Sequence, residues 1–594
     1  MFERELMDVA LQHAVGRAKW IDLEKEITRK IEKGELIQEA PKYHSTEEMD
    51  IASSEPLTRN QWMDKLVITG TLQKQAKKEI NDAILQGMLV QSEVRFTTPE
   101  ALKREKIILQ LEREGRNRLK PILAHEKVHA ILQNSDLNKG QQQAAALILS
   151  TTNQVIGIQG YAGTGKSHML DKTKRLIEAE GFKVRALAPY SSQVKALQEL
   201  NVKANTLASF IRGKEKDIDA KTVLVIDEAG VVPTRLMEKV LQLAEKAGSR
   251  VVLLGDIAQT KAIEAGRPFD QLQAAGMQTA LMDTIQRQKN LELKKAVELA
   301  AQGHSARALN HVHHIHEIKD HQARRQAIAK EYVQLSSDDQ ARTIIVTGTN
   351  EARREINKQV RIGLKLEGTG ITCDTLARQD ITRAERMYAK HYRVGDFIQP
   401  ERDYPSCGLM RAVLYRVEDS SIGNRLMVRS MENQQTIEFN PMTHRKLSVY
   451  EPDKTELSSG DVVRMTRNDK DLDIANGDRF KITSVSSHQI VITNGQRTVN
   501  LDPKQPLHLD YAYATTVHSS QGLTADRVLI DTHAQSRTTA KDVFYVALSR
   551  ARFETTIYTN DRKNLPFLIS RDNTKFAALD LAKKHGREFS CSFK

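Results

Sequence analysis

Residues 155–167 read VIGIQGYAGTGKS. Val155–Gly160 is a short, nearly continuous apolar run, which is typical of a buried parallel strand, and a helical pattern begins at Ser167. Gly160 to Ser167 fits the pattern G-x-x-x-x-G-K-[ST] between them. After a strand and before a helix, this pattern predicts a phosphate-binding loop, because glycines let the backbone turn its N–H groups onto phosphates at a helix N-terminus.

The side chains of this loop predict how it would hold a nucleotide. We expect Lys166 to neutralise the β and γ oxygens and to act in catalysis, and Ser167 to ligate Mg²⁺. The other loop residues predicted to bind nucleotide are Gly160, Gly163, Thr164 and Gly165. The alternative is a glycine-rich turn that binds nothing, which the complete motif in its strand–helix setting disfavours.

Apolar runs alternate with helical stretches on both sides of the loop. The further strands expected are Val184–Ala188, Val223–Ile226, Val251–Gly255 and, after a helical region, Thr343–Thr347. Near-continuous apolar strands between helices indicate parallel sheets covered on both faces, so the predicted fold class is α/β. Between residues 391 and 510, short strands with Gly and Asn turns predict a small antiparallel barrel or sandwich inserted in the second α/β unit.

The N-terminal region, residues 1–130, is charged, has a helical pattern and contains a repeat. Glu26, Ile27, Ile31, Gly34, Leu36 and Gln38 recur 53 residues later as Glu79, Ile80, Ile84, Gly87, Leu89 and Gln91. Each copy is expected to be a short helix ending near Gly, a brief extension, and a Ser or Thr that caps a new helix. A duplicated helical unit with a scaffold role is the default interpretation.

Composition limits the class of protein. The chain has 594 residues, a net charge of +13, 40% hydrophobic and 28% charged residues, which is typical of a folded chain of about four domains. The modest positive charge permits a polyanionic partner. The three cysteines lie far apart, which argues against a disulfide framework and a zinc module, and no apolar run approaches the ~18 residues of a membrane span. We therefore expect a cytoplasmic protein.

Acidic and amide side chains follow two of the predicted strands. Asp227 and Glu228 end the run VLVI, where ligands gather in open α/β sheets, so we expect Asp227 to hold Mg²⁺ and Glu228 to polarise the attacking water. Asp256 and Gln259, in GDIAQ, are expected beside the γ-phosphate, Asp256 as a nucleotide-binding residue and Gln259 as a sensor of hydrolysis. The alternatives are an ordinary acidic strand end and a simple strand-to-loop turn.

Two arginines are predicted to reach the γ-phosphate. Arg287 lies in LMDTIQRQ, and Arg550 lies in FYVALSRAR. An arginine supplied from a second domain accelerates phosphoryl transfer by about 10³–10⁵-fold and makes it depend on domain closure. Arg552 is instead expected to be a surface ion-pair residue.

The segment TTVHSSQG, residues 515–522, is rich in hydroxyls but has no acid. Thr516, His518 and Gln521 suit contacts to a nucleic-acid backbone, although His518 taken alone fits a structural histidine. The His-rich segment from His311 to His316 lacks a completing carboxylate or Cys nearby and is expected to be a solvated or interfacial strand, not a metal site.

In this order, the segments resemble superfamily 1 helicases of the 1B, RecD-like branch, over about residues 131–565. The resemblance implies two RecA-like domains sharing ATP in the cleft between them, with an SH3-like β-barrel insertion in the second. It also implies that Gln141 reads adenine and that the APYSSQ and NTL segments contact single-stranded DNA. The residues carried over for that contact are Pro189, Ser191, Gln193 and Thr206.

The N-terminal duplicate, its TTPE turn and the LNKGQ segment resemble more specifically the helicase half of conjugative relaxases of the TraI/TrwC (MobF) type. That resemblance implies 5′→3′ travel on single-stranded DNA, a role in plasmid transfer in the bacterial cytoplasm, and partners in the relaxosome and the type IV secretion machinery. The implied domains are 1–130, a helical region; 131–285, domain 1A; 286–390 with 511–594, domain 2A; and 391–510, insertion 2B.

The sequence therefore predicts an ATP- and Mg²⁺-dependent DNA helicase. Two alternatives remain open: a stand-alone RecD-like repair or replication helicase, and a DNA-binding scaffold whose nucleotide site no longer turns over.

Overall fold

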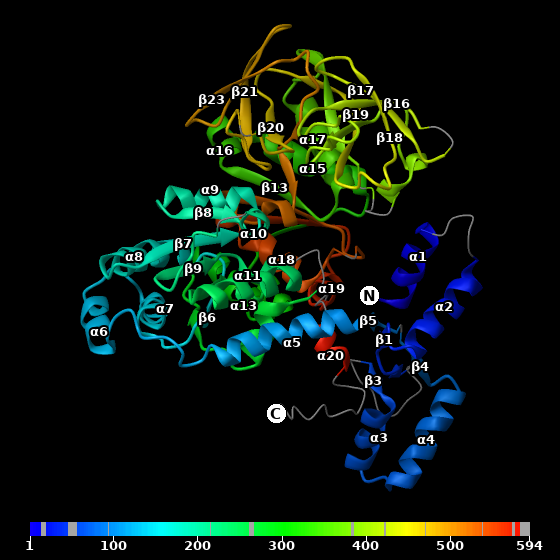
Figure 1. The fold of residues 1–594 in the computed structure, drawn as a ribbon, viewed down its shortest axis with the longest axis vertical. Coiled ribbons are helices and arrows are strands. Elements are labelled where there is room, and N and C mark those ends of the chain that lie inside the picture. The colour runs from blue at the N-terminus through cyan, green and yellow to red at the C-terminus, as the bar shows by residue number, and fades with distance from the viewer. Residues whose placement is uncertain are drawn as a thin grey trace. The chain divides into compact units, whose positions relative to one another are not determined.

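The computed structural model describes the chain except for residues 14–18, 46–55, 93, 214–215, 261–265, 380, 382–384, 421–422, 470, 537, 573–576 and 583–594. Two compact units make up the chain. The larger consists of Leu111–Ile263 and Phe269–Thr574, and the smaller of Met1–Gln110, Glu264–Pro268 and Lys575–Lys594. The larger unit contains two parallel sheets, called here the first and second lobes, and an antiparallel insertion (Figure 1).

The first lobe is built on a six-stranded sheet in which every pair is parallel. Its order is β11 (Thr279–Met282), β6 (Val155–Gly160), β10 (Arg250–Gly255), β9 (Thr222–Ile226), β7 (Lys183–Ala188) and β8 (Lys203–Thr206). All residues of β6, β9 and β10 are buried, which explains their unbroken apolar runs. The parallel sheet predicted for this part of the chain is confirmed.

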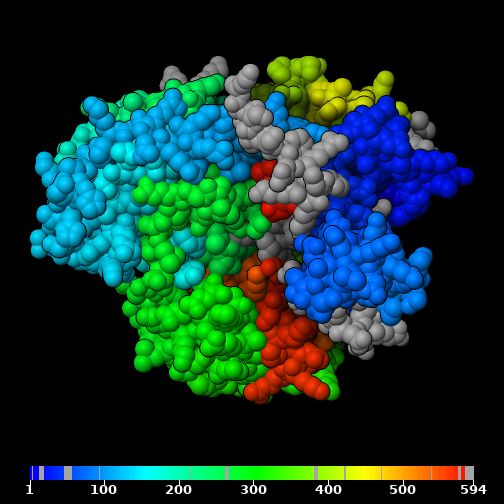
Figure 2. Space-filling view, turned by 90° about the horizontal axis from the view of Figure 1, so that it is seen from below, coloured from blue at the N-terminus to red at the C-terminus, as the bar shows by residue number. Residues whose placement is uncertain are grey.

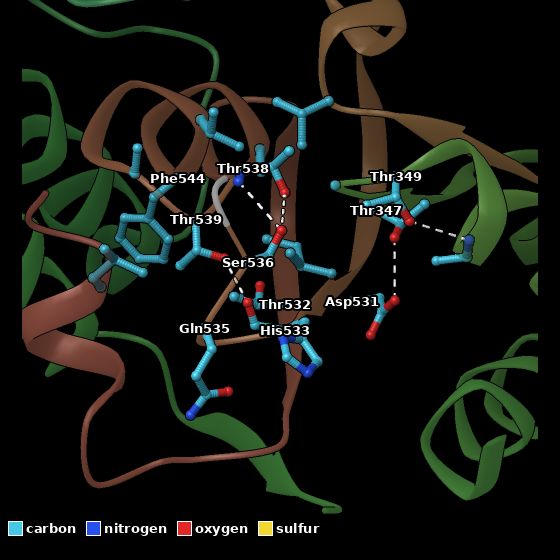
Figure 3. A pocket seen from close by; sticks show the side chains of 18 of the residues that line it. Thr347, Thr349, Asp531, Thr532, His533, Gln535, Ser536, Thr538, Thr539 and Phe544 are labelled. Atoms are coloured by element: carbon cyan, nitrogen blue, oxygen red, sulfur yellow. Dashed lines mark hydrogen bonds between the residues drawn. The ribbon is translucent and has the colours of Figure 1, made fainter. Parts of the chain in front are cut away.

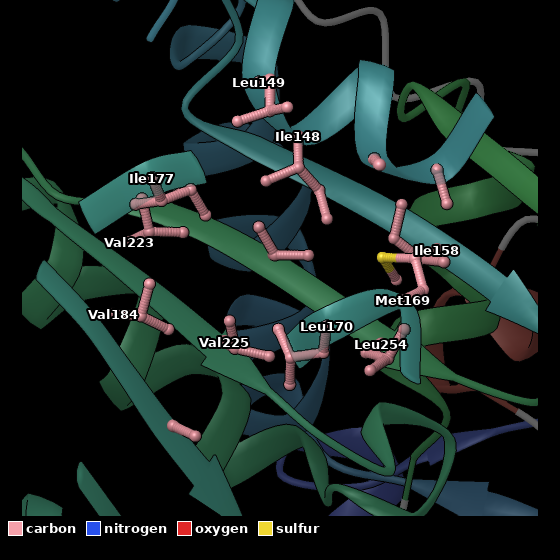
Figure 4. Close-up of a cluster of buried hydrophobic side chains, with 14 of the residues drawn as sticks. Ile148, Leu149, Ile158, Met169, Leu170, Ile177, Val184, Val223, Val225 and Leu254 are labelled. Atoms are coloured by element: carbon pink, nitrogen blue, oxygen red, sulfur yellow. The ribbon is translucent and has the colours of Figure 1, made fainter. Parts of the chain in front are cut away.

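Helices cover this sheet. They are α6 (His125–Gln133), α7 (Lys139–Ser150), α8 (Lys166–Ala179), α9 (Ser191–Glu199), α10 (Leu207–Arg212), α11 (Thr234–Ala247) and α12 (Pro268–Ala274), with a short 3₁₀ turn η1 (Ala229–Val231). Side chains of α6 to α9 pack on the strands in one buried core, where Ile148, Met169 and Leu170 meet Val225 and Leu254 (Figure 4). The core holds the strand ends, and with them the phosphate loop, in fixed register.

The second lobe has a five-stranded sheet, again parallel throughout. Its order is β12 (His314–Glu317), β27 (Ala551–Thr559), β26 (Ala525–Thr532), β13 (Thr343–Thr347) and β25 (Ala514–Thr516). The strand predicted at Thr343–Thr347 is therefore present with the same bounds. The second half of the His-rich segment lies in the edge strand β12, in which three of the four residues are exposed, and His311 and His313 precede that strand.

Helices from distant parts of the chain cover the second sheet. They are α13 (Leu291–Ala301), α14 (Ser305–Leu309), α15 (His321–Gln334), α16 (Ser337–Ala341), α17 (Asn350–Gly363), α18 (Lys541–Leu548) and α19 (Leu565–Leu568), with a 3₁₀ turn η4 (His518–Ser520). α13, α14, α18 and α19 share one core, and α15 and α17 share another. In Figure 2 green residues of the α13–α14 region lie beside the orange and red C-terminal residues of this lobe.

The insertion is larger than the small barrel that the sequence pattern predicted. One antiparallel sheet has the order β14 (Ile371–Arg378), β19 (Leu447–Leu457), β15 (Phe397–Pro400), β16 (Tyr415–Asp419), β17 (Leu426–Ser430) and β18 (Thr436–Phe439). The other has the order β23 (Thr498–Leu501), β22 (Ile490–Thr493), β21 (Arg479–Val485), β20 (Val462–Met465) and β24 (Leu509–Tyr511). Two 3₁₀ turns, η2 (Glu385–Met387) and η3 (Ala389–His391), lie between β14 and β15.

The predicted start of the insertion at residue 391 therefore comes too late. β14 already pairs along its whole length with β19, so the antiparallel structure begins at Ile371. One buried core lies within the six-stranded sheet, and a second joins Cys373 of β14 and Leu457 of β19 to the five-stranded sheet. An SH3-like barrel is not confirmed. The strand was missed because only part of β14 is buried, which gives no continuous apolar run.

The smaller unit contains the repeat. Its elements are α1 (Glu3–His13), α2 (Trp20–Glu32), β1 (Ile37–Gln38), β2 (Lys42–Ser45), β3 (Leu57–Thr58), α3 (Arg59–Ile68), α4 (Gln73–Leu85), β4 (Leu89–Gln91), β5 (Phe96–Thr97), α5 (Pro99–Glu114) and α20 (Ala578–Ala582). Gly34 and Gly87 end the first helix of each copy in the left-handed conformation, as predicted. Thr98 caps α5, but the corresponding helix start after Ser45 lies outside the described residues.

The two copies pair reciprocally. β1 of the first copy pairs with β5 of the second, where Gln38 faces Phe96, and β2 pairs with β4, where Tyr43 faces Gln91. At the 53-residue offset Gln38 corresponds to Gln91 and Tyr43 to Phe96, so each pairing is the image of the other. The duplicated units form a pseudo-two-fold pair.

Among the described residues, no helix is both long and apolar enough to cross a membrane.

Candidate nucleotide and nucleic-acid site

The phosphate loop joins β6 to α8 at the carboxyl edge of the first sheet. Gly163 and Gly165 have φ angles of 83° and 81°, in the left-handed region that glycine adopts without strain. The loop is also crowded: a Cβ at Gly163 would lie 2.6 Å from Cβ of Arg287. Nζ of Lys166 donates to the carbonyls of Gly160 (2.6 Å) and Tyr161 (3.4 Å), so its charge has no carboxylate partner among the described residues.

Gln141, the predicted adenine reader, lies against this loop. Its Nε2 donates to Thr164 O at 3.0 Å and approaches Gly165 O at 3.5 Å, and its Oε1 accepts from Asn138 N. Gln141 N in turn donates to Asn138 Oδ1, which completes a capping box at the start of α7. The structure thus places Gln141 at the loop, with its amide occupied by backbone groups.

Asp227 and Glu228 follow β9 at the same edge of the sheet. Burial, and after it the charge of Glu228, raise the pKa of Asp227 to about 7, whereas Lys166 acts in the opposite direction. Glu228 has a φ angle of 49°, which a residue with a side chain seldom adopts and which is common where function constrains the backbone. The two carboxyl groups form an acidic pair with no direct ion-pair partner among the described residues, although Lys166, Arg287 and Arg550 act on them from a distance.

Asp256 accepts four hydrogen bonds at the end of β10. Its donors are Gln159 Nε2 (3.1 Å), Ala258 N (3.0 Å), Gln259 Nε2 (3.2 Å) and Tyr545 Oη (2.7 Å). Gln259, predicted to sense hydrolysis, is 5% exposed and directs its amide onto this carboxylate. The GDxxQ segment is a buried hydrogen-bond hub at the strand end.

Both predicted arginines lie between the lobes. Arg287 N donates to Gly163 O at 3.1 Å, and Arg287 Nη1 donates to Ser549 O at 3.0 Å. Arg550 is 2% exposed and binds Val546 O (2.9 Å) and Ser549 Oγ (2.7 Å).

The arginine charges influence one another and Glu228. Burial, and after it the charge of Arg287, lower the pKa of Arg550 to about 10, whereas Glu228 acts in the opposite direction. Burial also lowers the pKa of Arg287, again with Glu228 acting in the opposite direction. Neither arginine has an ion-pair partner in the described part of the chain. Arg552, by contrast, forms the expected ion pair, with Asp526 at 3.0 Å.

Sequence reasoning missed Tyr545. Its hydroxyl, on α18 of the second lobe, accepts from Ala162 N of the phosphate loop at 2.7 Å and donates to Asp256 at 2.7 Å. The motif FYVALSRAR drew attention to its arginine, and no local signal indicates that the tyrosine reaches a loop 383 residues away.

The segments of the first lobe predicted to contact DNA lie at the sheet edge. Ser191 begins α9, and Gln193 Oε1 accepts from Tyr190 N at 3.3 Å. Thr206 caps α10 by accepting from Ser209 N at 3.2 Å. These side chains, with Pro189, are partly exposed at the carboxyl ends of β7 and β8, which are adjacent strands.

The TTVHSSQG segment follows β25 in the second lobe. Thr516 Oγ1 donates to Ser519 Oγ at 3.0 Å, and His518 is exposed. Gln521 Nε2 donates to Thr260 Oγ1 of the first lobe at 2.7 Å, so this segment also touches the GDxxQ turn.

A cavity of about 360 Å³ lies beside this segment, at the carboxyl ends of β13 and β26 (Figure 3). Its wall carries hydroxyl groups of Thr347, Thr349, Thr532, Ser536, Thr538 and Thr539, and Val517, Ile530 and Phe544 add apolar surface. The Arg324–Asp531 ion pair, at 2.8 Å, neutralises the charge at its base. The next strand of this sheet along the chain after β13 is β25, on one side of it, whereas the next after β26 is β27, on the opposite side. The cavity therefore lies at a topological switch point, where open α/β sheets bind ligands.

No group of three or more His, Cys, Asp or Glu side chains that could hold a metal occurs among the residues described. Within the His-rich segment, His311 binds Glu292 at 2.7 Å. A Mg²⁺ ion needs no such cluster, because it keeps waters and uses one or two carboxylates with the substrate phosphates.

Two family models match the chain. Residues 136–323 match a model described as an AAA domain, and residues 433–559 match one described as a viral superfamily 1 RNA helicase core domain. Together they cover the phosphate loop, the acidic pair, Arg287 and the motif that carries Arg550.

The relatives found are conjugation proteins. The chain is 26% identical over 571 residues to multifunctional conjugation protein TraI of Escherichia coli K12, which covers 85% of this chain and 32% of TraI. It is 24% identical over 490 residues to conjugal transfer protein TraA of Rhizobium radiobacter, which covers 80% of this chain and 37% of TraA. The chain thus spans about a third of the length of these relatives.

Among solved structures, Pif1 helicase from Bacteroides in complex with ADP-AlF3 and single-stranded DNA is 19% identical, covers 77% of this chain and 99% of its own, and has a TM-score of 0.37. The matched family models and relatives carry the assignment. With its two parallel-sheet lobes, its phosphate loop and the two matched family models, the chain resembles superfamily 1 helicases and, in sequence, the conjugation proteins TraI and TraA.

Proposed function

We propose that the chain hydrolyses ATP between its two lobes and uses the cycle to move 5′→3′ along single-stranded DNA, as the helicase part of a conjugative relaxase. The phosphate loop binds the triphosphate, Glu228 polarises the attacking water, and Arg287 and Arg550 stabilise charge at the γ-phosphate. Gln141 takes the adenine edge after giving up its contact with Thr164. Gln259 links the γ-phosphate position to the second lobe.

This proposal rests on one observation. Three positively charged side chains that form no ion pair with a carboxylate among the described residues lie near the acidic residues at the end of β9. Lys166 binds only carbonyls, and the buried Arg287 and Arg550 bind only backbone or hydroxyl oxygens. Buried charges are costly unless they are paired, so their arrangement favours a polyanion as the missing partner. The triphosphate of bound ATP would supply this negative charge, and loss of the γ-phosphate after hydrolysis would remove part of it.

The metal-binding residues proposed are Ser167 and Asp227. The raised pKa of Asp227 shows a carboxyl group whose negative charge is poorly compensated in the protein alone, which fits a site for a divalent cation. When bound, Mg²⁺ would neutralise phosphate charge and orient the terminal phosphoryl group. The chain's own contribution is to hold Ser167 in the first turn of α8 and Asp227 directly after β9, both at the carboxyl edge of the first sheet.

The DNA strand is proposed to cross the edges of both lobes. Pro189, Ser191, Gln193 and Thr206 form the part on the first lobe, and Thr516, His518 and Gln521 form the part on the second. Hydroxyl and amide groups of this kind contact phosphates and sugars without reading sequence. The similarity to TraI and TraA supports the conjugative role and, with it, relaxosome and type IV secretion partners in a bacterial cytoplasm.

The decisive assay is ATP hydrolysis by the wild-type protein with and without single-stranded DNA, compared with Lys166→Ala. The wild type is expected to be stimulated by DNA. The variant is expected to bind DNA with unchanged affinity and to lose stimulated hydrolysis, because one phosphate cation is missing at the triphosphate. Lys172→Ala, which removes an exposed lysine on the same helix, is the matched control.

The same assay separates the alternatives. A wild-type protein that binds single-stranded DNA without hydrolysing ATP would be a scaffold. Unchanged turnover in Lys166→Ala would refute the site. A stand-alone repair helicase would show the same hydrolysis, and the presence of a transesterase upstream in the complete gene distinguishes the conjugative protein from it.

A further inference from the structure

Tyr545 joins the two lobes through one oxygen atom. Its side chain is completely buried on α18. A backbone N–H can only donate and a carboxylate only accept, so the direction of both bonds is fixed: Ala162 N–H donates to the phenolic oxygen, which donates its own hydrogen to Asp256 Oδ2. Burial and Asp256 raise the pKa of Tyr545 well above its usual value, which keeps that hydrogen in place.

This oxygen meets the two segments of the first lobe that surround the phosphates. Ala162 belongs to the phosphate loop, and Asp256 begins the GDxxQ turn. Asp256 Oδ2 is shared between Tyr545 and Gln259 Nε2, at 2.7 and 3.2 Å. A shift of the tyrosine therefore alters the contact that holds Gln259.

The same helix holds both arginines. Ser549, which ends α18, accepts from Arg287 Nη1 and from Gln288 Nε2 (3.2 Å) through its carbonyl and from Arg550 Nη2 through its hydroxyl. Arg550 Nε returns to Val546 O in the last turn of the helix. The six residues from Tyr545 to Arg550 span the end of α18 and carry both kinds of contact. Tyr545 binds the phosphate loop, and Ser549 binds the side chains of both arginines.

We propose that Tyr545 is a positioning residue that couples the phosphate loop to the arginines, so that Arg287 and Arg550 reach the γ-phosphate only when the tyrosine hydroxyl bridges Ala162 and Asp256. This inference rests on the proposed ATP hydrolysis. It adds one role for the tyrosine hydroxyl. A shift of the phosphate loop would move Tyr545 and, through about one and a half turns of helix, the residues that hold the two arginines.

The physical basis is the cost of an unmade hydrogen bond. When the lobes separate, the Asp256 oxygen and the Ala162 N–H exchange their shared partner for water, and an intramolecular hydrogen bond to a charged group has a net favourable free energy over that exchange. The closed arrangement is therefore favoured by a contact that acts on no substrate atom. Without the hydroxyl, closure becomes looser and the arginines arrive with less accurate geometry, which slows the chemical step more than binding.

The test is Tyr545→Phe, which removes one oxygen atom and keeps the ring. We expect kcat for hydrolysis with saturating single-stranded DNA to fall about tenfold, as loss of one hydrogen bond to a charged group predicts, with KM for ATP little changed. The rate without DNA should change less, so that the stimulation ratio falls. Base pairs unwound per ATP should fall with it.

Tyr513→Phe is the matched control. Its buried hydroxyl also donates to a carboxylate, Asp461 Oδ1, at 2.7 Å, but outside the nucleotide site. Both variants should lose similar thermal stability, measured by melting temperature, and bind a fluorescent ATP analogue and single-stranded DNA like the wild type. Only Tyr545→Phe should lose stimulation.

Each result decides the matter. A stimulation ratio in Tyr545→Phe equal to that of the wild type, or a fall shared equally with Tyr513→Phe, would show a purely structural tyrosine and overturn the inference. Wild-type protein without DNA-stimulated hydrolysis would instead overturn the proposed function, before either variant is compared.

Discussion

At the scale of single residues, Asp227 is the group whose ionisation is most clearly linked to the site. An unfolded aspartate has a pKa of about 3.9, whereas that of Asp227 is raised to about 7. Between these values the folded protein retains a proton that the unfolded chain has released. The contribution of Asp227 to stability therefore falls as pH rises from about 4 to about 7.

Asp227→Asn removes this penalty. In protein free of nucleotide and metal, the variant should be more stable than the wild type by about 1–3 kcal/mol at pH 8 and close to it at about pH 4. Melting temperatures of both proteins across this pH range, in a chelating buffer, measure the difference. A difference that does not depend on pH would mean that Asp227 is already compensated in the folded protein.

Residue types in sequence located most of the candidate site, but not its contacts. The loop from Gly160 to Ser167 could be predicted because the spacing of its glycines, lysine and serine determines its conformation locally. The contacts of Tyr545 could not, because they join a helix to residues 289 and 383 positions away. Gln141 stays a predicted adenine reader, and the hydrogen bond of its amide to Thr164 O could not be foreseen from the sequence.

At the scale of elements, α9 links the proposed DNA track to the insertion. The helix begins at Ser191, and one turn later Lys195 Nζ donates to Asp473 O (2.8 Å) and Asp478 Oδ2 (2.9 Å), which precede β21. Lys195 thereby fastens the five-stranded sheet of the insertion to the first lobe, next to the residues predicted to hold the strand.

Lys195→Ala should loosen this attachment. Because the pair is partly exposed, we expect a modest effect of about 0.2–1 kcal/mol, seen as an about 1.4- to fivefold faster release of single-stranded DNA at low salt. Stopped-flow dissociation of a labelled oligonucleotide measures it. Lys203→Ala, which breaks an exposed ion pair with Asp217 within the first lobe, is the control, and equal rates in the two variants would contradict the attachment.

Buried strands were predicted well at this scale, and half-exposed strands were not. Val155–Gly160 and Thr343–Thr347 agree with the observed bounds because parallel strands covered on both faces are apolar throughout. The start of the insertion was misplaced because β14 mixes buried and exposed residues. The repeat was visible in the sequence, but its reciprocal pairing was not, since strand pairing between copies depends on tertiary structure.

At the scale of the whole molecule, two parallel-sheet lobes share one charged site. The first lobe supplies the phosphate loop and the acidic pair. Arg287 lies beside that loop, and the second lobe supplies Arg550 and the carbonyl of Ser549 that orients Arg287. Hydrolysis should therefore require both lobes, and closing and opening would move DNA across their edges.

The most direct test is the rate of ATP hydrolysis at saturating single-stranded DNA in Arg550→Ala and Arg552→Ala. The two arginines are two residues apart, but only Arg552 has a carboxylate partner in the described structure. We expect Arg550→Ala to lose about 10³-fold or more in kcat with DNA affinity retained, and Arg552→Ala to stay near the wild-type rate. Turnover in Arg550→Ala within about tenfold of the wild type would contradict catalysis between the lobes.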